Sequence, residues 1–412
     1  MLERTKKIIF AVFFVIFSIG MGYGLYWMFF VGKPTLAPQP TPEELAGQLP
    51  AAGVGVPVVA VTPTAPGVLP SGEFIPPTPI TGPTQPAAEV KTRLLYDGIT
   101  QAVTESPTGD GARYYNPEDG RFYKITDDGS ISLLSLKQFF NVDKVSWGNQ
   151  EDQAILEFPD GSNVYYDFNA KRQVTLPAHW EEFDFAANDS RVAAKSMGVD
   201  VNNRWLMISN PDGTEAKALE ALGNNASKAH VSWDPQGDIV AYAETGQLRG
   251  NNEQEILFVG KNHENFKGLI APGQDFLPNW SPTGKQLLFS VWHPDSRNRP
   301  VLWITSGETA DIGANRRNLQ INTWADKCVW ASDSLLYCGV PQNLPDNAGI
   351  KRDDFANLPD DVYRVNLDTG ISQKINTPDQ NYTIRQPVLN RDKTKLIFSD
   401  ANSGKLYSYD VK

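Results

Sequence analysis

Histidine and cysteine, which often build catalytic and metal sites, are scarce in this 412-residue chain. The four histidines are His179, His230, His263 and His293. They are far apart, at no spacing typical of metal ligands or of a catalytic triad. The G-x-S-x-G elbow of serine hydrolases is absent. We therefore predict no metal, no cofactor and no catalytic residue, and hence a protein that is not an enzyme.

An excess of positive charge is also missing. Residues 91–412 hold 33 Lys plus Arg against 43 Asp plus Glu, and the whole chain has a net charge of −11. Nucleic-acid-binding proteins need a basic surface. We therefore expect no nucleic-acid partner.

Charged residues are absent from 8–31, which is 24 residues long. A helix of that length covers about 36 Å and can cross a bilayer. Arg4, Lys6 and Lys7 precede the stretch and Lys33 follows it. The positive-inside rule then predicts residues 1–7 in the cytoplasm and everything after residue 31 on the extracytoplasmic side. We expect a single-pass signal anchor in the cytoplasmic membrane.

Two features of this apolar stretch leave alternatives open. A cleaved signal peptide is one, although the stretch exceeds a usual h-region and no small-x-small cleavage site follows it. Gly20 and Gly24 form a G-x-x-x-G pair that would let two helices approach closely, in a homodimer. Glycine is also common in membrane helices without such a role.

Residues 32–90 have the composition of a linker. They contain 14 of the 30 prolines, with few charges and almost no aromatic residues. Such a stretch cannot bury a core. We predict a Pro-rich disordered spacer between the membrane and a folded domain at 91–412.

A hairpin motif recurs through 91–412. The best copy is LPNWSPTGKQLLFS at 277–290, in which a Trp-Ser-Pro-x-Gly turn joins two short strands. The Trp or its equivalent stands at positions 147, 185, 233, 280, 330 and 389. A third alternating strand and a short fourth one follow most copies. We read these Trp residues as core between sheets.

Four antiparallel strands in each 40–50 residues are typical of a β-propeller blade. A further unit precedes the first Trp, between residues 98 and 134. The last unit has only three strands, and Arg93–Tyr96 is a spare fourth strand that would close the ring. We predict an all-β propeller of about seven blades, with six or eight as alternatives.

The motifs NWSPTGKQLLFS, VSWDPQGDIVAYA and DDVYRVNLDTG resemble the TolB-type, WD-repeat-like β-propeller repeats. The resemblance covers about residues 91–412. It implies a propeller, often extracytoplasmic, that usually presents a binding surface to other proteins. No separate α/β domain precedes the repeats here, unlike in TolB itself.

Cys328 and Cys338 flank the hairpin at 329–337 symmetrically. If the turn centres on Asp333, they are direct cross-strand partners within reach of a disulfide. The extracytoplasmic side is oxidising in many organisms. Two buried free thiols are the alternative.

Insertions between the second and third strands occur in four consecutive units, at 196–204, 244–253, 292–300 and 339–360. In a propeller these loops emerge on one face, where insertions often mark a binding site. The loops carry Arg and aromatic residues of the kind that anchor interfaces. The predicted partner-binding residues are Arg249, Trp292, His293, Arg297, Arg299, Lys351, Arg352 and Phe355. Solvated, variable loops are the plainer interpretation.

Two functional hypotheses follow from these observations. The first is a membrane-anchored, non-catalytic scaffold that binds unidentified proteins of the cell envelope. The second is a propeller enzyme that acts on a glycan or peptide with carboxylates in its central funnel. Propeller catalysis assembles from separate blades, so local motifs miss it. Convergent carboxylates with raised pKa at one end of the channel would favour the enzyme. A structural spacer is a weaker third reading.

Overall fold

The structure is a computed structural model of the chain, and it describes residues 20, 92–250, 252–376 and 379–411. The chain divides into two units, 1–82 and 83–412. Within the described residues, no helix has the length and apolarity needed to cross a membrane. Except for Gly20, the predicted membrane helix at 8–31 and the predicted linker at 32–90 lie outside the described residues.

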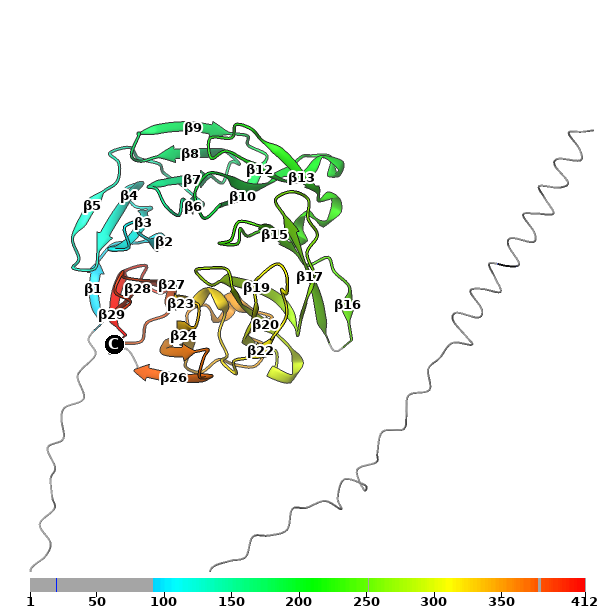
Figure 1. The fold of residues 1–412 in the computed structure, drawn as a ribbon. Helices are drawn as coiled ribbons and strands as arrows, with labels where there is room; N and C mark the ends of the chain where they lie inside the picture. The colour runs from blue at the N-terminus through cyan, green and yellow to red at the C-terminus, as the bar shows by residue number, and fades with distance from the viewer. Residues whose placement is uncertain (1–19, 21–91, 251, 377–378, 412) are drawn as a thin grey trace, which may run out of the picture. The chain divides into compact units, whose positions relative to one another are not determined.

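The described strands form seven antiparallel sheets arranged as a ring (Figure 1). Blades 1 to 3 run through the first half of the domain, each from an inner to an outer strand. Blade 1 consists of β2 (Gln101–Glu105), β3 (Gly111–Asn116), β4 (Arg121–Thr126) and β5 (Ile131–Leu133). Blade 2 consists of β6 (Lys144–Trp147), β7 (Gln153–Glu157), β8 (Asn163–Asp167) and β9 (Arg172–Leu176). Blade 3 consists of β10 (Trp180–Phe185), β11 (Val192–Met197), β12 (Arg204–Ser209) and β13 (Lys217–Ala221).

Blades 4 to 6 carry the longer insertions. Blade 4 consists of β14 (Ala229–Val231), β15 (Ile239–Ala243), β17 (Glu253–Gly260) and β18 (Leu269–Ala271), with the additional β16 (Leu248–Arg249). Blade 5 consists of β19 (Gln274–Trp280), β20 (Gln286–Trp292), β21 (Pro300–Ser306) and β22 (Arg317–Asn318). Blade 6 consists of β23 (Cys328–Ser332), β24 (Leu335–Pro341), β25 (Asp360–Asn366) and β26 (Ile371–Asn376). The described 3-10 turns are η2 (Val201–Asn203), η3 (Gly223–Lys228), η4 (Pro294–Ser296), η5 (Ala325–Lys327) and η6 (Arg352–Phe355).

Blade 7 combines both ends of the described domain. It consists of β27 (Ile384–Leu389), β28 (Lys395–Asp400) and β29 (Leu406–Asp410), completed by β1 (Arg93–Tyr96) from the start of the domain. Arg93 pairs with Ser408 and Leu94 with Tyr407. Figure 1 shows β1 beside β29 at the closure. The predicted ring closure and the count of seven blades are both confirmed.

The repeated turn is stabilised by the residue after the Trp position. In the copy at 277–290, the Ser281 hydroxyl accepts the Gln286 N–H at 3.1 Å, and Gly284 takes a φ of +73°. The Asp234 carboxylate accepts two N–H groups of its own turn, each at 2.8 Å. A short polar side chain here replaces a missing backbone partner. This requirement explains the short polar residue that stands at this position in three copies, Asp234, Ser281 and Asn390.

The core lies between blades. Seven buried apolar clusters each join two neighbouring sheets, including the pair made by blades 7 and 1. Indole groups add hydrogen bonds across the same boundaries: Trp147 Nε1 donates to Ala102 O at 2.8 Å, and Trp330 Nε1 donates to Asn279 Oδ1 at 3.0 Å. The recurring Trp residues are therefore structural, as the sequence predicted.

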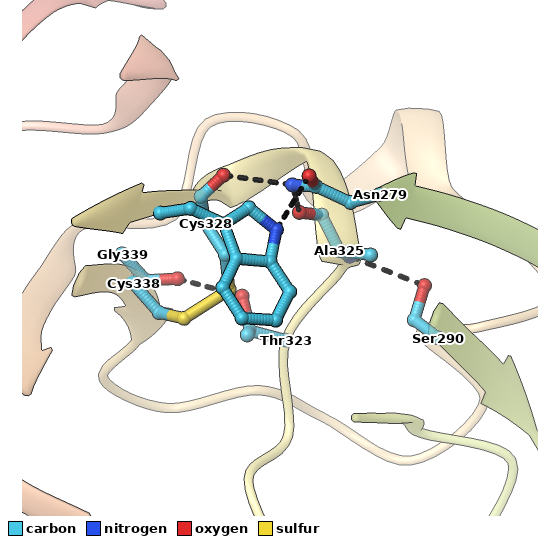
Figure 2. The surroundings of a disulfide bond; sticks show 8 residues. Asn279, Ser290, Thr323, Ala325, Cys328, Cys338 and Gly339 are labelled. Atoms are coloured by element: carbon cyan, nitrogen blue, oxygen red, sulfur yellow. Dashed lines mark hydrogen bonds between the residues drawn. A yellow bond between two sulfur atoms is a disulfide. The ribbon is translucent and has the colours of Figure 1, made fainter. Parts of the chain in front are cut away.

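A disulfide joins Cys328 and Cys338 at the boundary of blades 5 and 6 (Figure 2). The two residues are direct partners of β23 and β24, with Cα atoms 4.0 Å apart. Asn279 of β19 donates to the carbonyl oxygens of Ala325 and Cys328, each at 2.9 Å. The Asn279 amide thus helps to bind the disulfide hairpin to blade 5.

Candidate active site

Three adjoining hollows lie on one face of the ring, and together we call them the central funnel. The first, of about 560 Å³, includes Glu157, Glu182 and His230 in its wall. The second, of about 550 Å³, shares Arg385 and Gln386 with the first. The third, of about 730 Å³, shares His230 and Tyr242 with the first and Arg352 with the second. The hollows are therefore continuous.

The funnel opens on the face that carries the predicted insertion loops. Its wall includes Trp292 and the segment Gly349–Asp354 from two of those loops. The other lining residues come from the starts of inner strands and the ends of second strands. Both kinds of strand end lie on the side where second-to-third-strand loops emerge. The loops thus stand beside the funnel.

Four inner strands contain a β-bulge at the same place, next to the funnel. The register shifts in β2, β10, β19 and β27. The extra residue in each is Ala102, Glu182, Asp275 or Gln386, with φ between +49° and +61°. A left-handed conformation is strained for these residues, and bulges commonly re-aim a side chain near an active site. The bulges belong to blades 1, 3, 5 and 7.

Glu182 is held by a buried lysine. Lys195 Nζ lies 2.6 Å from Glu182 Oε1 and 3.9 Å from Glu181 Oε1, although Lys195 pairs with Glu181 in the backbone register. Lys195 is 3% exposed and also donates to the carbonyl oxygens of Ala226 and Ala229. Lys195 thereby fixes the position of the Glu182 carboxylate beside the funnel.

His230 stands between two carboxylates. Its Nδ1 atom is 4.0 Å from Glu182 Oε2, and its Nε2 atom is 3.8 Å from Glu244 Oε1. The ring stacks on Tyr242 with centroids 5.1 Å apart. Burial lowers the pKa of His230, and Glu182 opposes that shift. A neutral imidazole can accept a proton, and a neighbouring carboxylate then stabilises the charged ring.

Three carboxyl groups around the funnel have a raised pKa. Burial raises the pKa of Glu157, Glu244 and Asp275. A hydrogen bond from Gln254 partly opposes the shift at Glu244, and Arg352 partly opposes it at Asp275. A carboxyl with a raised pKa beside a histidine with a lowered pKa is the pattern of an acid and a base in one site. Among the described residues, no group of three or more metal-ligating side chains is placed to hold a metal ion.

The predicted partner-binding residues are divided among different places. Trp292, Lys351 and Arg352 line the third hollow. Arg249 is on β16, where it pairs with Glu255 at 3.6 Å. His293 precedes η4, and its Nδ1 accepts the Asp295 N–H at 3.1 Å.

The remaining predicted residues make contacts within the insertions. Arg299 pairs with Asp346 at 2.8 Å, and the Arg297 carbonyl accepts the Asn347 N–H at 2.9 Å. Phe355 packs against the small cluster around Trp324. These contacts fasten the insertion after β24 to the loop after β20, so they shape one side of the funnel.

Known proteins resemble this chain in sequence and in fold. No family model matches the chain. Dipeptidyl-peptidase 5 of Porphyromonas gingivalis is 22% identical over 236 residues, which is 48% of this chain and 33% of that protein. The chain therefore spans a third of the length of that curated relative.

Two solved structures show the shared architecture. An oligogalacturonate lyase in complex with manganese has a TM-score of 0.55 at 13% identity, covering 79% of this chain and 94% of that one. The β-propeller domain of Cps50 (Swd1) from Myceliophteria thermophila has a TM-score of 0.51 at 10% identity, covering 78% and 100%. At such identities the likeness establishes the fold. The domain is a seven-bladed β-propeller.

Our prediction that the protein is not an enzyme is contradicted by these findings. Two of the three similar proteins bear the names of enzymes, a lyase and a peptidase. The funnel also meets the criterion stated above, because carboxyls with raised pKa converge at one end of the channel. The motif search failed because Glu182, His230 and Glu244 come from two blades and three strands or loops.

Sequence reasoning overlooked Glu157, Glu182, Lys195, Glu244 and Asp275. A usable signal was present, since several inner strands begin with polar residues that do not fit a simple buried pattern. The bulges could not be predicted from the sequence, because none of the extra residues with positive φ is a glycine.

Proposed function

We propose that this chain is a glycan-cleaving enzyme whose acid–base site is the Glu182–His230–Glu244 cluster in the central funnel. The observation that carries the proposal is His230, with one carboxylate oxygen within about 4 Å of each ring nitrogen. Carboxyl groups on either side of a bound sugar are the usual means of cleaving glycosidic bonds. The fold shared with an oligogalacturonate lyase supports a carbohydrate substrate.

The environments suggest a role for each group. Glu244, with its raised pKa, donates a proton to the oxygen of the departing sugar. Neutral His230 accepts a proton from the water that attacks the anomeric carbon, so that a new C–O bond forms as the glycosidic C–O bond breaks. Glu182, held in place by Lys195, orients the imidazole and stabilises it when it becomes charged. Lys195 acts through Glu182 and is a positioning residue.

The cellular location is part of the proposal. The charge pattern around residues 8–31 supports an anchor in the cytoplasmic membrane with the propeller outside. The Cys328–Cys338 disulfide fits an oxidising compartment. The repeat motifs further support grouping this propeller with TolB-type repeats. Protease digestion of intact and permeabilised cells tests the location, and digestion only after permeabilisation would contradict it.

A peptide substrate is the second candidate, favoured by the similarity to dipeptidyl-peptidase 5. The His230 ring contacts two carboxylates and Tyr242. Ser146, also in the first hollow, donates its hydroxyl to the Phe183 carbonyl at 2.7 Å. Among the described residues of the funnel, no serine is thereby paired with this histidine as a nucleophile. The glycan is therefore preferred.

The test uses the full-length protein in detergent. It is incubated with a panel of cell-wall and capsular oligosaccharides, and cleavage is measured as new reducing ends, which both hydrolysis and elimination produce. Glu244→Gln and His230→Asn should each lower the rate on an accepted substrate by about 10²-fold or more. Chromogenic dipeptide substrates are assayed in parallel.

Matched controls are Glu220→Gln and His263→Asn, which change the same residue types at exposed positions outside the funnel. Both should retain the wild-type rate. Cleavage of no oligosaccharide, or full activity in Glu244→Gln, would refute the proposal. Cleavage of dipeptides alone would favour the second candidate.

A further inference from the structure

The charges of the funnel are unevenly distributed between its hollows. The second hollow, between blades 6 and 7, has three cationic side chains in its wall, Lys327, Arg352 and Arg385, with Asp326 as the only carboxylate among its lining residues. In the third hollow the four carboxyl groups of Glu244, Asp275, Asp353 and Asp354 outnumber the two cations, Lys351 and Arg352. A concentration of cations is unexpected in a domain with more acidic than basic residues.

Two of the three cations are already neutralised. Arg352 donates to both carboxylate oxygens of Asp326, at 2.8 and 2.6 Å, and its guanidinium lies 5.0 Å from the Trp324 ring. Lys327 Nζ is 2.7 Å from Asp360 Oδ2, and both side chains are buried. Each pair holds its members in place. These ion pairs leave Arg385 as the cation whose charge is uncompensated within the described part of this hollow.

Arg385 occupies a position suited to a ligand. It is exposed, makes no ion pair within the described residues, and lines both the first and second hollows. It immediately precedes Gln386, the bulge residue of β27 with φ of +49°. The Gln386 carbonyl oxygen Oε1 accepts the Val103 N–H at 3.0 Å, which fixes that amide. On the other side of Arg385, the Ile384 N–H donates to Asp360 Oδ2 at 2.7 Å, so both neighbours of Arg385 are held.

We propose that Arg385 forms an anion subsite that binds the carboxylate of a uronic-acid residue, so that the substrate of the funnel is an acidic oligosaccharide. This inference rests on the proposed function and specifies its substrate class. A planar guanidinium binds a carboxylate through two parallel hydrogen bonds. One uncompensated positive charge matches one carboxylate. Ala356 and Ala401 in the same wall, which are exposed and half-buried, supply apolar surface for the face of a sugar ring.

The subsite also explains the separation of charges. Arg385 lies in the wall of the same hollow as Glu182 and His230. A ligand carboxylate held by Arg385 is kept on the blade 7 side, away from the Glu182 carboxyl group on blade 3. An acidic sugar at Arg385 then directs the neighbouring linkage toward the acid–base cluster. The negative charge of the ligand thus fixes its orientation.

The experiment measures binding separately from cleavage. Isothermal titration of the full-length protein compares a galacturonate trisaccharide with the same trisaccharide methyl-esterified at its carboxyl groups. The wild type should bind the free acid at least tenfold more tightly than the ester. Arg385→Gln should weaken binding of the acid about tenfold or more and leave binding of the ester unchanged.

Arg391→Gln is the matched control. Arg385 lies near the start of β27, whereas Arg391 lies beyond its end, in the turn between β27 and β28. It should bind both ligands like the wild type. Equal affinity of the wild type for acid and ester, or equal loss of both ligands in Arg385→Gln, would overturn the subsite. Tighter binding of a sulfated neutral trisaccharide than of the uronate would also overturn it.

Binding and cleavage distinguish the two proposals. Selective binding of the acid through Arg385 without cleavage of any oligosaccharide would keep the subsite and refute the enzyme. Cleavage of neutral oligosaccharides with no preference for the acid would keep the enzyme and refute the subsite.

Discussion

The amine of Lys195 lies 2.6 Å from a carboxylate oxygen of Glu182, across the bulge that turns Glu182 toward the funnel. Lys195 is almost fully buried, whereas the Glu182 side chain is 32% exposed. The pair therefore joins the blade 3 core to the candidate active site.

Lys195→Met should lower both stability and activity. It removes charge-assisted hydrogen bonds to Glu182 and two bonds to backbone carbonyls, at a cost of about 2 kcal/mol of unfolding free energy. Urea unfolding measures this loss. Lys217→Met, at an exposed position of β13, serves as the control and should change stability by less than about 0.5 kcal/mol. Equal stability of the two variants would contradict the buried ion pair.

Asp184 should make stability depend on pH. Burial raises its pKa to about 6, although its carboxylate accepts the Trp233 N–H at 2.7 Å. The folded state therefore binds the proton more tightly than the unfolded state. The resulting stabilisation is complete below about pH 4 and is lost as the pH rises through about 6.

Asp184→Asn removes this titration and retains an oxygen acceptor for Trp233. The variant should gain stability relative to the wild type as the pH rises, by on the order of 2 kcal/mol near pH 7. Urea unfolding at a series of pH values measures the difference. A difference that does not change with pH would show that Asp184 has an ordinary pKa. Asp368→Asn, in an exposed turn, is the control.

The Cys328–Cys338 bond should stabilise blade 6. It closes a loop with a sequence separation of 10 residues, which corresponds to about 2 to 3 kcal/mol in the chain-entropy model. Adding a reductant should lower the urea midpoint of the wild type. The Cys328→Ala/Cys338→Ala variant should have the lower midpoint with or without reductant. A mass change of two protons on reduction confirms the bond itself, and an unchanged mass would disprove it.

Closure of the ring by β1 predicts a contrast between adjacent leucines. Leu95 is 8% exposed and packs in the cluster between blades 7 and 1, whereas Leu94 is 45% exposed. Leu95→Ala should cost about 2 to 4 kcal/mol of unfolding free energy. Leu94→Ala should cost less than about 1 kcal/mol. Similar losses in both variants would mean that β1 does not complete blade 7 in this register.

Much of the propeller was predictable because its determinants are local. The turn at Ser281–Gly284 depends on residues within six positions of one another, and the alternation around Leu287 follows from the strand itself. Repetition of these local signals predicted the number of blades. The direct pairing of Cys328 with Cys338 followed from the symmetry of one short hairpin.

The candidate active site was not predictable in the same way. Glu182 and Glu244 approach His230 only when two blades are packed side by side, and Arg385 joins them from blade 7 at the far end of the sequence. The bulges that turn Glu182 and Asp275 toward the axis depend on register against a neighbouring strand. The sequence by itself thus determined the repeated blade, since its strands pair with near neighbours in the chain. The strand missing from the last repeat indicated the closure, although Arg93 pairs with Ser408 at the other end of the domain. The tertiary structure alone decided which charged groups meet, because ring closure brings together residues as distant in the sequence as Val103 and Gln386, which are 283 positions apart.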